Sequence, residues 1–306
     1  MAEDEKIPEL SVEIVNDMLS PRVDISSLEH ETDHRKVDGV VFELYKETFS
    51  LVNLTAHLLS EADGVKGGWP RNQAICAGLL IRICKFMLVV IELAADGNRA
   101  EVVHALNRSI LESAVNLEFL VRTKDDKFYE QFVKLSLAPE RELYDFIQEN
   151  ITARQGQVLP IEQRMIDSIN DVCKVSGVKI ENVDRKSGDW SGGMRERLKA
   201  IKKENIYAMV QRIPSHAVHG TWVDLYKNHL EYVDKADVYA PQPRFAWVDA
   251  RLLGPAAIFV LDSVRPYLER FFAQMENFMM VKERLDDLEE RIIKAEQTHE
   301  RLFAEA

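Results

Sequence analysis

The stretch AICAGLLIRICKFMLVVIELAA, residues 74–95, decides between a membrane protein and a helical bundle. It is long enough to span a bilayer as a helix. Three charged residues, Arg82, Lys85 and Glu92, nevertheless fall on one stripe of that helix. Each would cost about 2.5–3.5 kcal/mol near a membrane centre. The stretch therefore predicts a central helix of a bundle, with its charged stripe facing water or a partner, and no membrane span.

Helical spacing continues on both sides of this stretch. Apolar residues recur every three or four positions over residues 35–61, 99–122, 206–230 and 247–273, which predicts amphipathic helices. Residues 160–175 follow the same rule, and their expected core face is Ile161, Met165, Ile169 and Val172. Residues 125–153 predict one helix or two, because Pro139 should kink or break them.

The stretch YVDKADVYAPQPRFAW, residues 232–247, differs from the rest in its alternating and proline-rich character. This pattern predicts an extended connector or at most a small edge strand. Since every other periodic segment is helical, the expected fold class is all-α: a helical bundle with long amphipathic helices and a coiled-coil-like helix at the carboxyl end. The expected organisation is a flexible or poorly packed segment over residues 1–30, a bundle domain over 31–275 and the last helix over 276–306.

The carboxyl end has the clearest periodicity in the chain. Its apolar positions step by three and four residues in strict alternation: Phe278, Val281, Leu285, Leu288, Ile292, Ala295, His299 and Leu302. This is the a/d spacing of a left-handed coiled coil. It predicts a homo-oligomer formed through residues 278–302. The alternative is that the helix packs back on its own bundle.

Composition limits the classes of partner and the compartment. The formal charge is -12 at pH 7, so no diffuse positive field attracts phosphate backbones, and nucleic-acid binding would require a local basic patch. The three cysteines form no CxxC pair and are odd in number, which favours reduced thiols over a disulfide framework. The acidic start MAEDEKIPEL has no secretory signal pattern. We therefore expect a cytoplasmic protein.

Nucleotide and metal motifs are weak. The segment SGDWSGG, residues 187–193, has glycines but no P-loop or dinucleotide fingerprint, and its Trp190 is expected to anchor the loop on the bundle or, alternatively, to cover a polar site. Glu-x-x-His pairs occur at Glu31/His34, Glu101/His104 and Glu296/His299. In a glutamate-rich chain such pairs arise by chance. The expectation is therefore no metal and no cofactor.

One polar stripe lies on an otherwise apolar helix. His104, Arg108, Glu112 and Asn116 recur every four residues, so they share one face and require partners or water. They could form an interior site. The alternative is an Arg108–Glu112 pair on a solvated face, which contributes only about 0.2–0.5 kcal/mol.

The stretch SHAVHGTW, residues 215–222, contains the second candidate group. Arg212, His216 and His219 share a face if one helix continues through Pro214. If Pro214 instead begins a new helix, Ser215 lies in its first turn, where backbone N–H groups are free to bind an anion. The alternative is a locally hydrogen-bonded serine beside a buried, satisfied histidine.

Two stretches together resemble a bacterial helical family of unknown function. LNRSILESAVNLEFLVR, residues 106–122, is similar to the family's R-S-x-x-E-x-x-x-N core helix at Arg108, Glu112 and Asn116. YAMVQRIPSHAVHGTW, residues 207–222, is similar to its downstream Tyr and Ser-x-x-Val-His-Gly signature at Tyr207, Ser215 and His219. The resemblance covers roughly residues 35–275. It implies an all-helical fold in which the two motifs meet, but no established reaction.

A weaker likeness is to HEPN-type helical ribonucleases, which carry an arginine and a histidine separated by four to six residues. Arg212 and His219 satisfy that spacing, although Ile213 and Pro214 depart from the usual pattern. The likeness implies a metal-independent ribonuclease, in a defence or toxin setting. His219 would be the general base and Arg212 would stabilise the phosphorane charge.

Three functions follow from these patterns. The leading hypothesis is a binding or interaction module whose polar inter-helix site is formed by these residues: Arg108, Glu112, Asn116, Tyr207, Ser215 and His219. The alternatives are the HEPN-like ribonuclease and a pure oligomeric scaffold. The site hypothesis requires that Arg108 and His219 converge.

Overall fold

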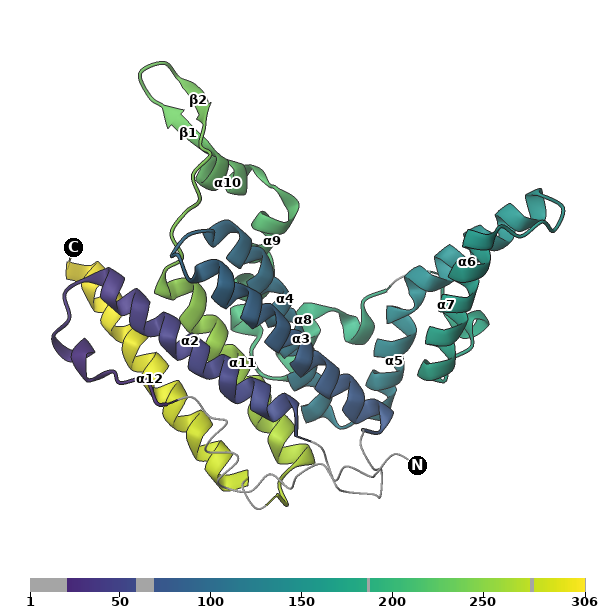
Figure 1. Cartoon of the computed structure of the whole chain (residues 1–306), viewed down its shortest axis with the longest axis horizontal. Helices are drawn as coiled ribbons and strands as arrows, with labels where there is room; N and C mark the ends of the chain where they lie inside the picture. The colour runs from purple at the N-terminus through teal and green to yellow at the C-terminus, as the bar shows by residue number, and fades with distance from the viewer. Residues whose placement is uncertain (1–20, 59–68, 186–187, 276–277, 306) are drawn as a thin grey trace, which may run out of the picture.

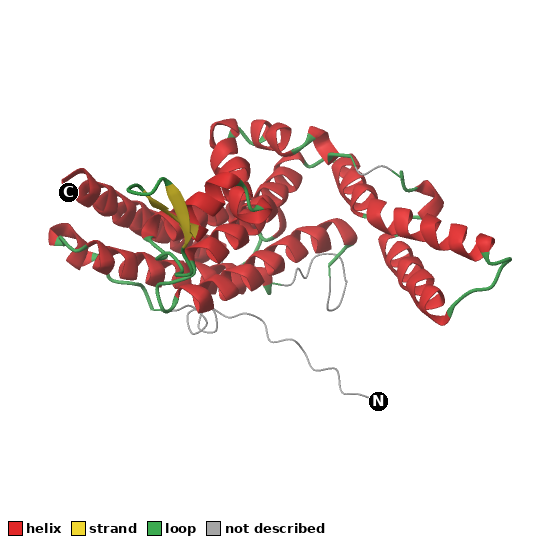
Figure 2. Ribbon diagram, turned by 90° about the horizontal axis from the view of Figure 1, so that it is seen from above, coloured by secondary structure: helices red, strands yellow, loops and turns green. Residues whose placement is uncertain are grey.

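The chain folds into a helical bundle with one short β-hairpin, as the computed structural model shows for residues 21–58, 69–185, 188–275 and 278–305 (Figures 1 and 2). The predicted all-α fold class is confirmed. The five long helices of these residues are α2 (His34–Ala56), α3 (Arg71–Ala94), α4 (Ala100–Thr123), α11 (Ala250–Phe271) and α12 (Phe278–Glu305). The shorter helices are α5 (Asp126–Ser136), α6 (Ala138–Ala153), α7 (Pro160–Ser176), α8 (Met194–Ala200), α9 (Ile213–His219) and α10 (Trp222–Asp224).

Single turns of 3-10 helix occur at η1 (Ser26–His30), η3 (Ile180–Asn182), η4 (Trp190–Gly192) and η5 (Glu204–Ile206). Two further segments, η6 (Ala208–Arg212) and η7 (Leu225–His229), are π-helical. The strands are β1 (Leu230–Val233) and β2 (Val238–Pro241). Pro139 lies in the first turn of α6, so residues 125–153 form two helices.

Helix α4 occupies the centre of the bundle and packs against α3, α11, α8 and α9. Helix α3, predicted to be central, has one face buried against α2 and α4, while Leu88 and Val89 are exposed. Its charged residues Arg82, Lys85 and Glu92 all face water. Among the described residues, α3 is the one helix long and apolar enough to cross a membrane, and it is packed as a bundle helix.

The apolar seam of α12 is covered by the same chain. Val281, Leu285, Leu288 and Ile292 are 0% exposed, because α12 packs lengthwise on α2 and α11 (Figure 1). This is the arrangement given above as the alternative. The prediction of self-association through residues 278–302 assumed an open seam, whereas the seam is closed within one chain; self-association itself stays a prediction. Helix α12 shares the core of the bundle, and the expected division of the chain into three parts stays a prediction.

Buried ion pairs fix α12 in register on α2. Glu47 accepts two hydrogen bonds from Arg291, both 2.7 Å long, and lies 2.8 Å from Arg284. At the other end His299 lies 3.4 Å from Asp38, which also accepts a hydrogen bond from the backbone N–H of Ala250. The histidine of the heptad pattern therefore has its partner inside the chain.

The described part of the amino-terminal segment packs on these helices. Leu28 is fully buried, and Val23 is held at both backbone groups, its N–H donating to Glu47 and its C=O accepting from Arg291. Leu28 is the one buried residue of 21–30 and seven of these ten residues are exposed, so the poorly packed segment expected over residues 1–30 stays a prediction. Residues 1–20 lie outside the described part of the chain.

Helices α6 and α7 project from one end of the bundle (Figure 2). A small second core at the base of this arm includes Val133, Ile169 and Cys173. Of the core face predicted for residues 160–175, only Ile169 is buried, and the other three residues are exposed: Ile161, Met165 and Val172. Helix α7 has two stripes of helical period, and it packs through the one that contains Glu162, Ile169 and Cys173.

The segment after residue 200 is less regular than its periodicity predicts. The π-helical turn η6 runs directly into α9, which has Pro214 in its first turn and ends at Gly220 with φ +55°. Pro214 therefore changes the winding of a continuous helical segment and does not separate two helices. Residues 230–241 form an antiparallel hairpin with Tyr232 opposite Tyr239, instead of a connector or a single edge strand.

Candidate functional site

Arg108 connects the two stretches that the sequence singled out. Its Nε donates to Glu112 Oε1 at 2.9 Å, one turn along α4. Its Nη1 lies 3.2 Å from Nε2 of His219, on α9. An arginine has no acceptor atom, so Nε2 of His219 accepts this bond and its ring proton is on Nδ1. The two candidate groups thus meet across a helix interface.

Gln211 completes this polar network. When its side-chain amide is oriented to satisfy its neighbours, its nitrogen donates to Glu112 Oε1 at 2.9 Å and its oxygen accepts from Arg108 Nη2 at 3.0 Å. Arg108 then donates to three different acceptors. Sequence analysis missed Gln211, although it stands one helical turn before Ser215.

The remaining predicted residues surround the network without joining it directly. The Ser215 hydroxyl donates to the backbone carbonyl of Gln211, so it supports the segment that carries the glutamine. Asn116 lies one turn beyond Glu112, with its Oδ1 buried and unpartnered among the described residues. His104, one turn before Arg108, is half-buried, and burial lowers its pKa.

Arg212, His216 and His219 have different partners, although an uninterrupted α-helix would put them on one face. The Arg212 guanidinium lies 5.8 Å from the ring centre of Tyr207, His216 Nδ1 lies 2.7 Å from Thr221 Oγ1, and His219 contacts Arg108. The π-helical turn ends at Arg212 and the α-helix begins at Ile213, so the three residues keep α-helical spacing and differ in the neighbouring elements that they contact. Across the described residues, no hydrogen bond or ion pair joins Arg212 to His219.

Two arginines lie over the ring of Tyr207. The Arg195 guanidinium, from α8, is 4.8 Å from the ring centre, and Arg212, from η6, is 5.8 Å from it. Both arginines are exposed to solvent, and Arg195 lies 3.9 Å from Glu204. Stacking on an aromatic face holds a guanidinium in place while leaving its N–H donors available.

The segment that carries these arginines is basic in an acidic chain. Residues 194–219 contain six arginines and lysines against two glutamates, a net charge of +4, whereas the whole chain carries -12. The basic residues are Arg195, Arg197, Lys199, Lys202, Lys203 and Arg212. Four of these side chains are exposed, whereas Arg197 is buried and Lys203 pairs with Glu118.

Arg197 belongs to this basic segment but is buried. Its Nη1 donates to the Trp190 carbonyl at 2.9 Å, its guanidinium lies 4.5 Å from the Trp190 ring centre, and its Nε is unpartnered among the described residues. Burial lowers the pKa of Arg197, against the opposing fields of Asp189 and Glu112. Trp190 also packs edge-on against Phe119 and Phe132, so it anchors its loop on the bundle as expected.

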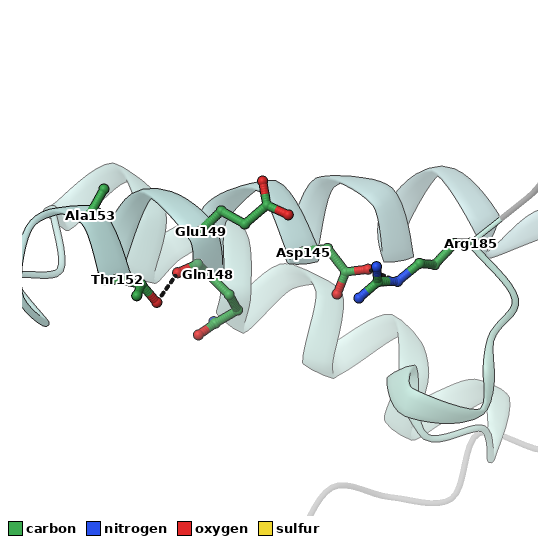
Figure 3. A pocket seen from close by; sticks show the side chains of 6 residues that line it. All are labelled: Asp145, Gln148, Glu149, Thr152, Ala153 and Arg185. Atoms are coloured by element: carbon green, nitrogen blue, oxygen red, sulfur yellow. Dashed lines mark hydrogen bonds and ion pairs between the residues drawn. The ribbon is translucent and has the colours of Figure 1, made fainter.

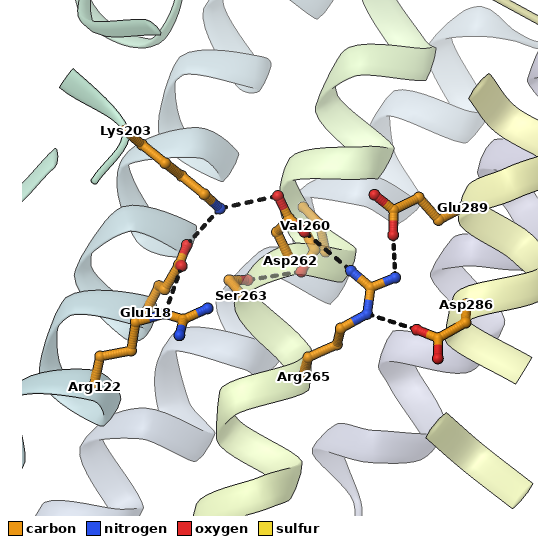
Figure 4. A network of polar contacts seen from close by, with 9 residues as sticks. All are labelled: Glu118, Arg122, Lys203, Val260, Asp262, Ser263, Arg265, Asp286 and Glu289. Carbon is orange, nitrogen blue, oxygen red and sulfur yellow. Dashed lines mark hydrogen bonds and ion pairs between the residues drawn. The ribbon is translucent and has the colours of Figure 1, made fainter. Parts of the chain in front are cut away.

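A chain of ion pairs fixes the basic segment to the bundle (Figure 4). Lys203 Nζ donates to Glu118 on α4 at 2.8 Å and to Asp262 on α11 at 2.9 Å. Asp262 in turn accepts from Arg265, which also donates to Asp286 on α12. Because Glu118 is 0% exposed, Lys203 neutralises a charge that has little access to water. These ion pairs therefore connect the basic segment to α4 and α11 directly, and to α12 through Arg265.

The other described parts of the chain contain weaker candidates for a ligand-binding site. An open hollow on the projecting arm is lined by Asp145, Gln148, Glu149, Thr152, Ala153 and Arg185 (Figure 3). Its Asp145 is already paired with Arg141 at 3.0 Å and with Arg185 at 2.8 Å. Among the residues that the structure describes, no three His, Cys, Asp or Glu side chains form a group that could hold a metal ion.

Comparison with known proteins places the chain in a family without an assigned activity. The model of a family of unknown function, DUF5677, matches residues 73–237, more than half of the chain. The chain belongs to the DUF5677 family. The DUF5677 region runs from α3 to the turn of the hairpin and contains both stretches on which the resemblance rested, although it is narrower than residues 35–275. No curated protein and no solved structure matches this DUF5677 chain.

Proposed function

We propose that this DUF5677 protein is a binding module that takes an anionic ligand on the surface formed by α8, η6 and α9. The observation that carries the proposal is the pair of exposed arginines, Arg195 and Arg212, over Tyr207. Guanidinium groups are suited to phosphate and carboxylate because they present several N–H donors in a fixed plane. The exposed side chains of residues 194–219 carry four positive and two negative charges, a net charge of +2 that adds attraction for an anion, whereas Arg197 and Lys203 are bound inside the protein.

The inter-helix network positions this surface. Arg108 is bound to Glu112, Gln211 and His219, so its charge is largely used inside the protein. Together with Ser215 it fixes η6 and α9 on α4, and η6 in turn carries Arg212. In this proposal Tyr207, Arg195 and Arg212 contact the ligand, while Arg108, Glu112 and Ser215 are positioning residues. His219 is exposed at the end of α9, beside this surface.

The ribonuclease alternative receives no comparable support. It requires Arg212 and His219 to act on one phosphate, whereas Arg212 stacks on Tyr207 and His219 contacts Arg108. The scaffold alternative leaves the exposed arginine pair without a role. Binding is therefore the function that the geometry favours.

We place this activity in the cytoplasm. Cys76, Cys84 and Cys173 are all buried and unpaired, as thiols in a reducing compartment are. Burial raises the pKa of the Cys76 thiol to about 11 and that of Cys84 to about 12. Both remain protonated and unreactive at neutral pH.

Pyrophosphate is a suitable probe because it carries several anionic oxygens in a small volume. We expect the unfolding temperature of the full chain to rise with the logarithm of pyrophosphate concentration, as linkage requires for a ligand of the folded state. The double variant Arg195→Gln/Arg212→Gln should lose this rise. Calorimetric titration of both proteins at low salt gives the binding isotherm directly.

Arg164→Gln is the matched control, because Arg164 is an exposed arginine on α7, away from the basic segment. Strongly hydrated anions also stabilise proteins without binding a site, and that effect should persist in every variant. Binding that is equal in the wild type and the double variant, or absent from the wild type, contradicts the proposal.

A further inference from the structure

Helix α7 carries an apolar stripe that the chain leaves open. We define the α7 stripe as Ile161, Met165, Ser168, Val172 and Val175. The exposed fractions of its four apolar residues lie between 37% and 79%. Exposed apolar residues that occur singly are ordinary, but a contiguous row on one helix face marks an interaction surface.

The α7 stripe has the spacing of a seam between helices. Its positions step by four and three residues in strict alternation, which is the a/d spacing of a coiled coil. The α12 seam has the same spacing, but there α2 and α11 cover it. Helix α7 packs on α6 and η3 through its other stripe, on an arm that projects from the bundle (Figure 2). The open stripe is therefore suited to a further helix from outside the chain.

Two unpaired charges lie along one edge of the stripe. Arg164 directly precedes Met165, and Asp171 directly precedes Val172, so both occupy the g position of a heptad. This edge faces away from the buried stripe of α7. Both side chains are exposed, and neither forms an ion pair or a hydrogen bond with another described residue. An occupant of the stripe can therefore pair with a cation and an anion at fixed positions.

A second copy of α7 in antiparallel orientation supplies both opposite charges. With a two-fold axis at Ser168, each residue lies level with the residue equally far on the other side of position 168. Arg164 of one copy then lies within one residue of Asp171 of the other, about 1.5 Å along the helix axis. Symmetry makes this contact twice. Parallel orientation would put residues of equal number level with each other, and the match of charges would be lost.

The apolar positions match under the same symmetry. Ile161 of one copy lies opposite Val175 of the other, and Met165 lies within one residue of Val172. Ser168, at the axis, is small enough for the two helices to approach closely. The charges and the apolar side chains of the stripe thus select the same register, and this self-complementarity identifies a second copy of the chain as the occupant.

We propose that α7 forms the interface of a two-fold symmetric dimer, in which two α7 stripes pair antiparallel and Arg164 of each copy pairs with Asp171 of the other. The contact is isologous, so the assembly closes at two copies. A stripe of two heptads buries a small area, so the dimer should dissociate on dilution. This inference is independent of the anion site, and it does not involve residues 278–302, whose seam is closed within one chain.

Light scattering of the full chain after size exclusion, over a hundred-fold range of concentration, tests the proposal. We expect the mass to rise towards twice the chain mass of 35.1 kDa at the upper concentrations. Arg164→Glu and Asp171→Arg each put like charges opposite one another, and each alone should raise the concentration for half-dissociation at least ten-fold. Lys174→Glu is the control for Arg164→Glu, because it makes the same change of charge at an exposed position that faces away from the stripe.

Mixing the two charge variants tests the register. In a mixed dimer the introduced glutamate faces the introduced arginine, and the native Arg164 of one copy faces the native Asp171 of the other. An equimolar mixture should therefore dimerise at concentrations at which neither variant does so alone. An occupant other than a second copy would not give this result.

Denaturant unfolding of the dilute, monomeric proteins should show every variant as stable as the wild type, because the α7 stripe is exposed in the single chain. Three results overturn the proposal. The wild type could be monomeric at every concentration, Lys174→Glu could dissociate the dimer as strongly as Arg164→Glu, or the mixture could stay monomeric although each variant alone has lost the dimer.

Discussion

The seam of α12 and the aromatic rings of the hairpin region are both apolar, but the chain covers the first and leaves the second exposed. The seam lies against α2 and α11 and is pinned by Glu47 and Asp38. The rings of Trp222, Tyr226, Tyr232 and Tyr239 contact one another and are 39–57% exposed. The regular apolar period of α12 therefore identifies a helix face that packs on other helices of the chain. The exposed aromatic side chains that remain available to other molecules lie in segments without such a period.

The largest effect on stability is expected at Leu288, in the middle of the α12 seam. Leu288→Asp places a carboxylate where the wild-type side chain is 0% exposed, and the arginines one turn away, Arg284 and Arg291, already pair with Glu47. We expect a loss of about 4 kcal/mol in the free energy of unfolding, because the change removes a fully buried apolar side chain and buries a charge in its place. Denaturant unfolding followed by circular dichroism measures it.

Val175→Asp on α7 is the matched change on an exposed apolar stripe, and we expect it to stay within about 0.5 kcal/mol of the wild type. A well-folded monomer produced by Leu288→Asp would show that the seam is an interface between copies after all.

A substitution at Lys203 tests how much a buried ion pair, rather than an apolar seam, contributes to the stability of the bundle. Lys203→Met leaves the fully buried Glu118 with Arg122 alone, and Arg122 is half-exposed. Removing one partner of a buried ion pair costs about 3–5 kcal/mol, and the remaining arginine puts the expected loss near 3. Lys202→Met, at the neighbouring exposed lysine, should have little effect. Equal unfolding midpoints for the two variants would mean that the network in Figure 4 contributes nothing to stability.

Arg108 and Arg212 separate the positioning network from the exposed surface. Arg108→Gln leaves half-buried polar groups on Glu112 and Gln211 without their donor, so the expected loss is about 1–3 kcal/mol. Arg212→Gln should leave stability nearly unchanged and weaken pyrophosphate binding. The assignment of roles fails if Arg212→Gln is the more destabilising of the two changes.

The smallest effect on stability is expected for a substitution at Glu296, and this effect depends on pH. It is half-buried against Gly254, where a Cβ would lie 1.9 Å from its Oε1. Burial, reinforced by Glu300, Asp249 and Asp38, raises the pKa of Glu296 from 4.5 to about 7. Its contribution to stability is therefore fully present below pH 4.5 and is lost as pH rises through 7.

Glu296→Gln removes the ionisation, so we expect the variant to gain about 1–2 kcal/mol over the wild type at pH 8 relative to pH 5. Urea unfolding at both pH values measures this difference. The same stability difference at pH 5 and pH 8 would contradict the assignment.

The sequence was informative wherever local periodicity alone determines structure. The charged stripe of residues 74–95 correctly predicted a bundle helix, and Pro139 correctly marked a boundary between helices. Periodicity does not identify the partner of a face, so the cover of the α12 seam by α2 and α11 was not predictable. Nor does it choose between two stripes of one helix, which is why Ile161, Met165 and Val172 of α7 were wrongly expected to be buried.

Several residues of the candidate site could be predicted from the sequence, but their geometry could not. Arg108, Glu112 and His219 were identified from helical spacing and from the family resemblance, and the structure brings them together. Their direct contact with a ligand stays a prediction, and the proposed function uses Arg108 and Glu112 as positioning residues. Helical spacing placed Arg212 and His219 on one face but could not identify their partners, because Tyr207 and Arg108 lie on a preceding turn and on another helix. Gln211 and Arg197 were missed because neither belongs to a motif.

Hydrogen–deuterium exchange of the full chain, with and without pyrophosphate, tests the contrast between covered and open surfaces most directly. The account predicts strong protection of residues 281–302 in both conditions, since their seam is closed within one chain. It predicts added protection on pyrophosphate binding at residues 195–219 and not on the α6–α7 arm. Rapid exchange across residues 281–302, or ligand-induced protection that avoids residues 195–219, would contradict it.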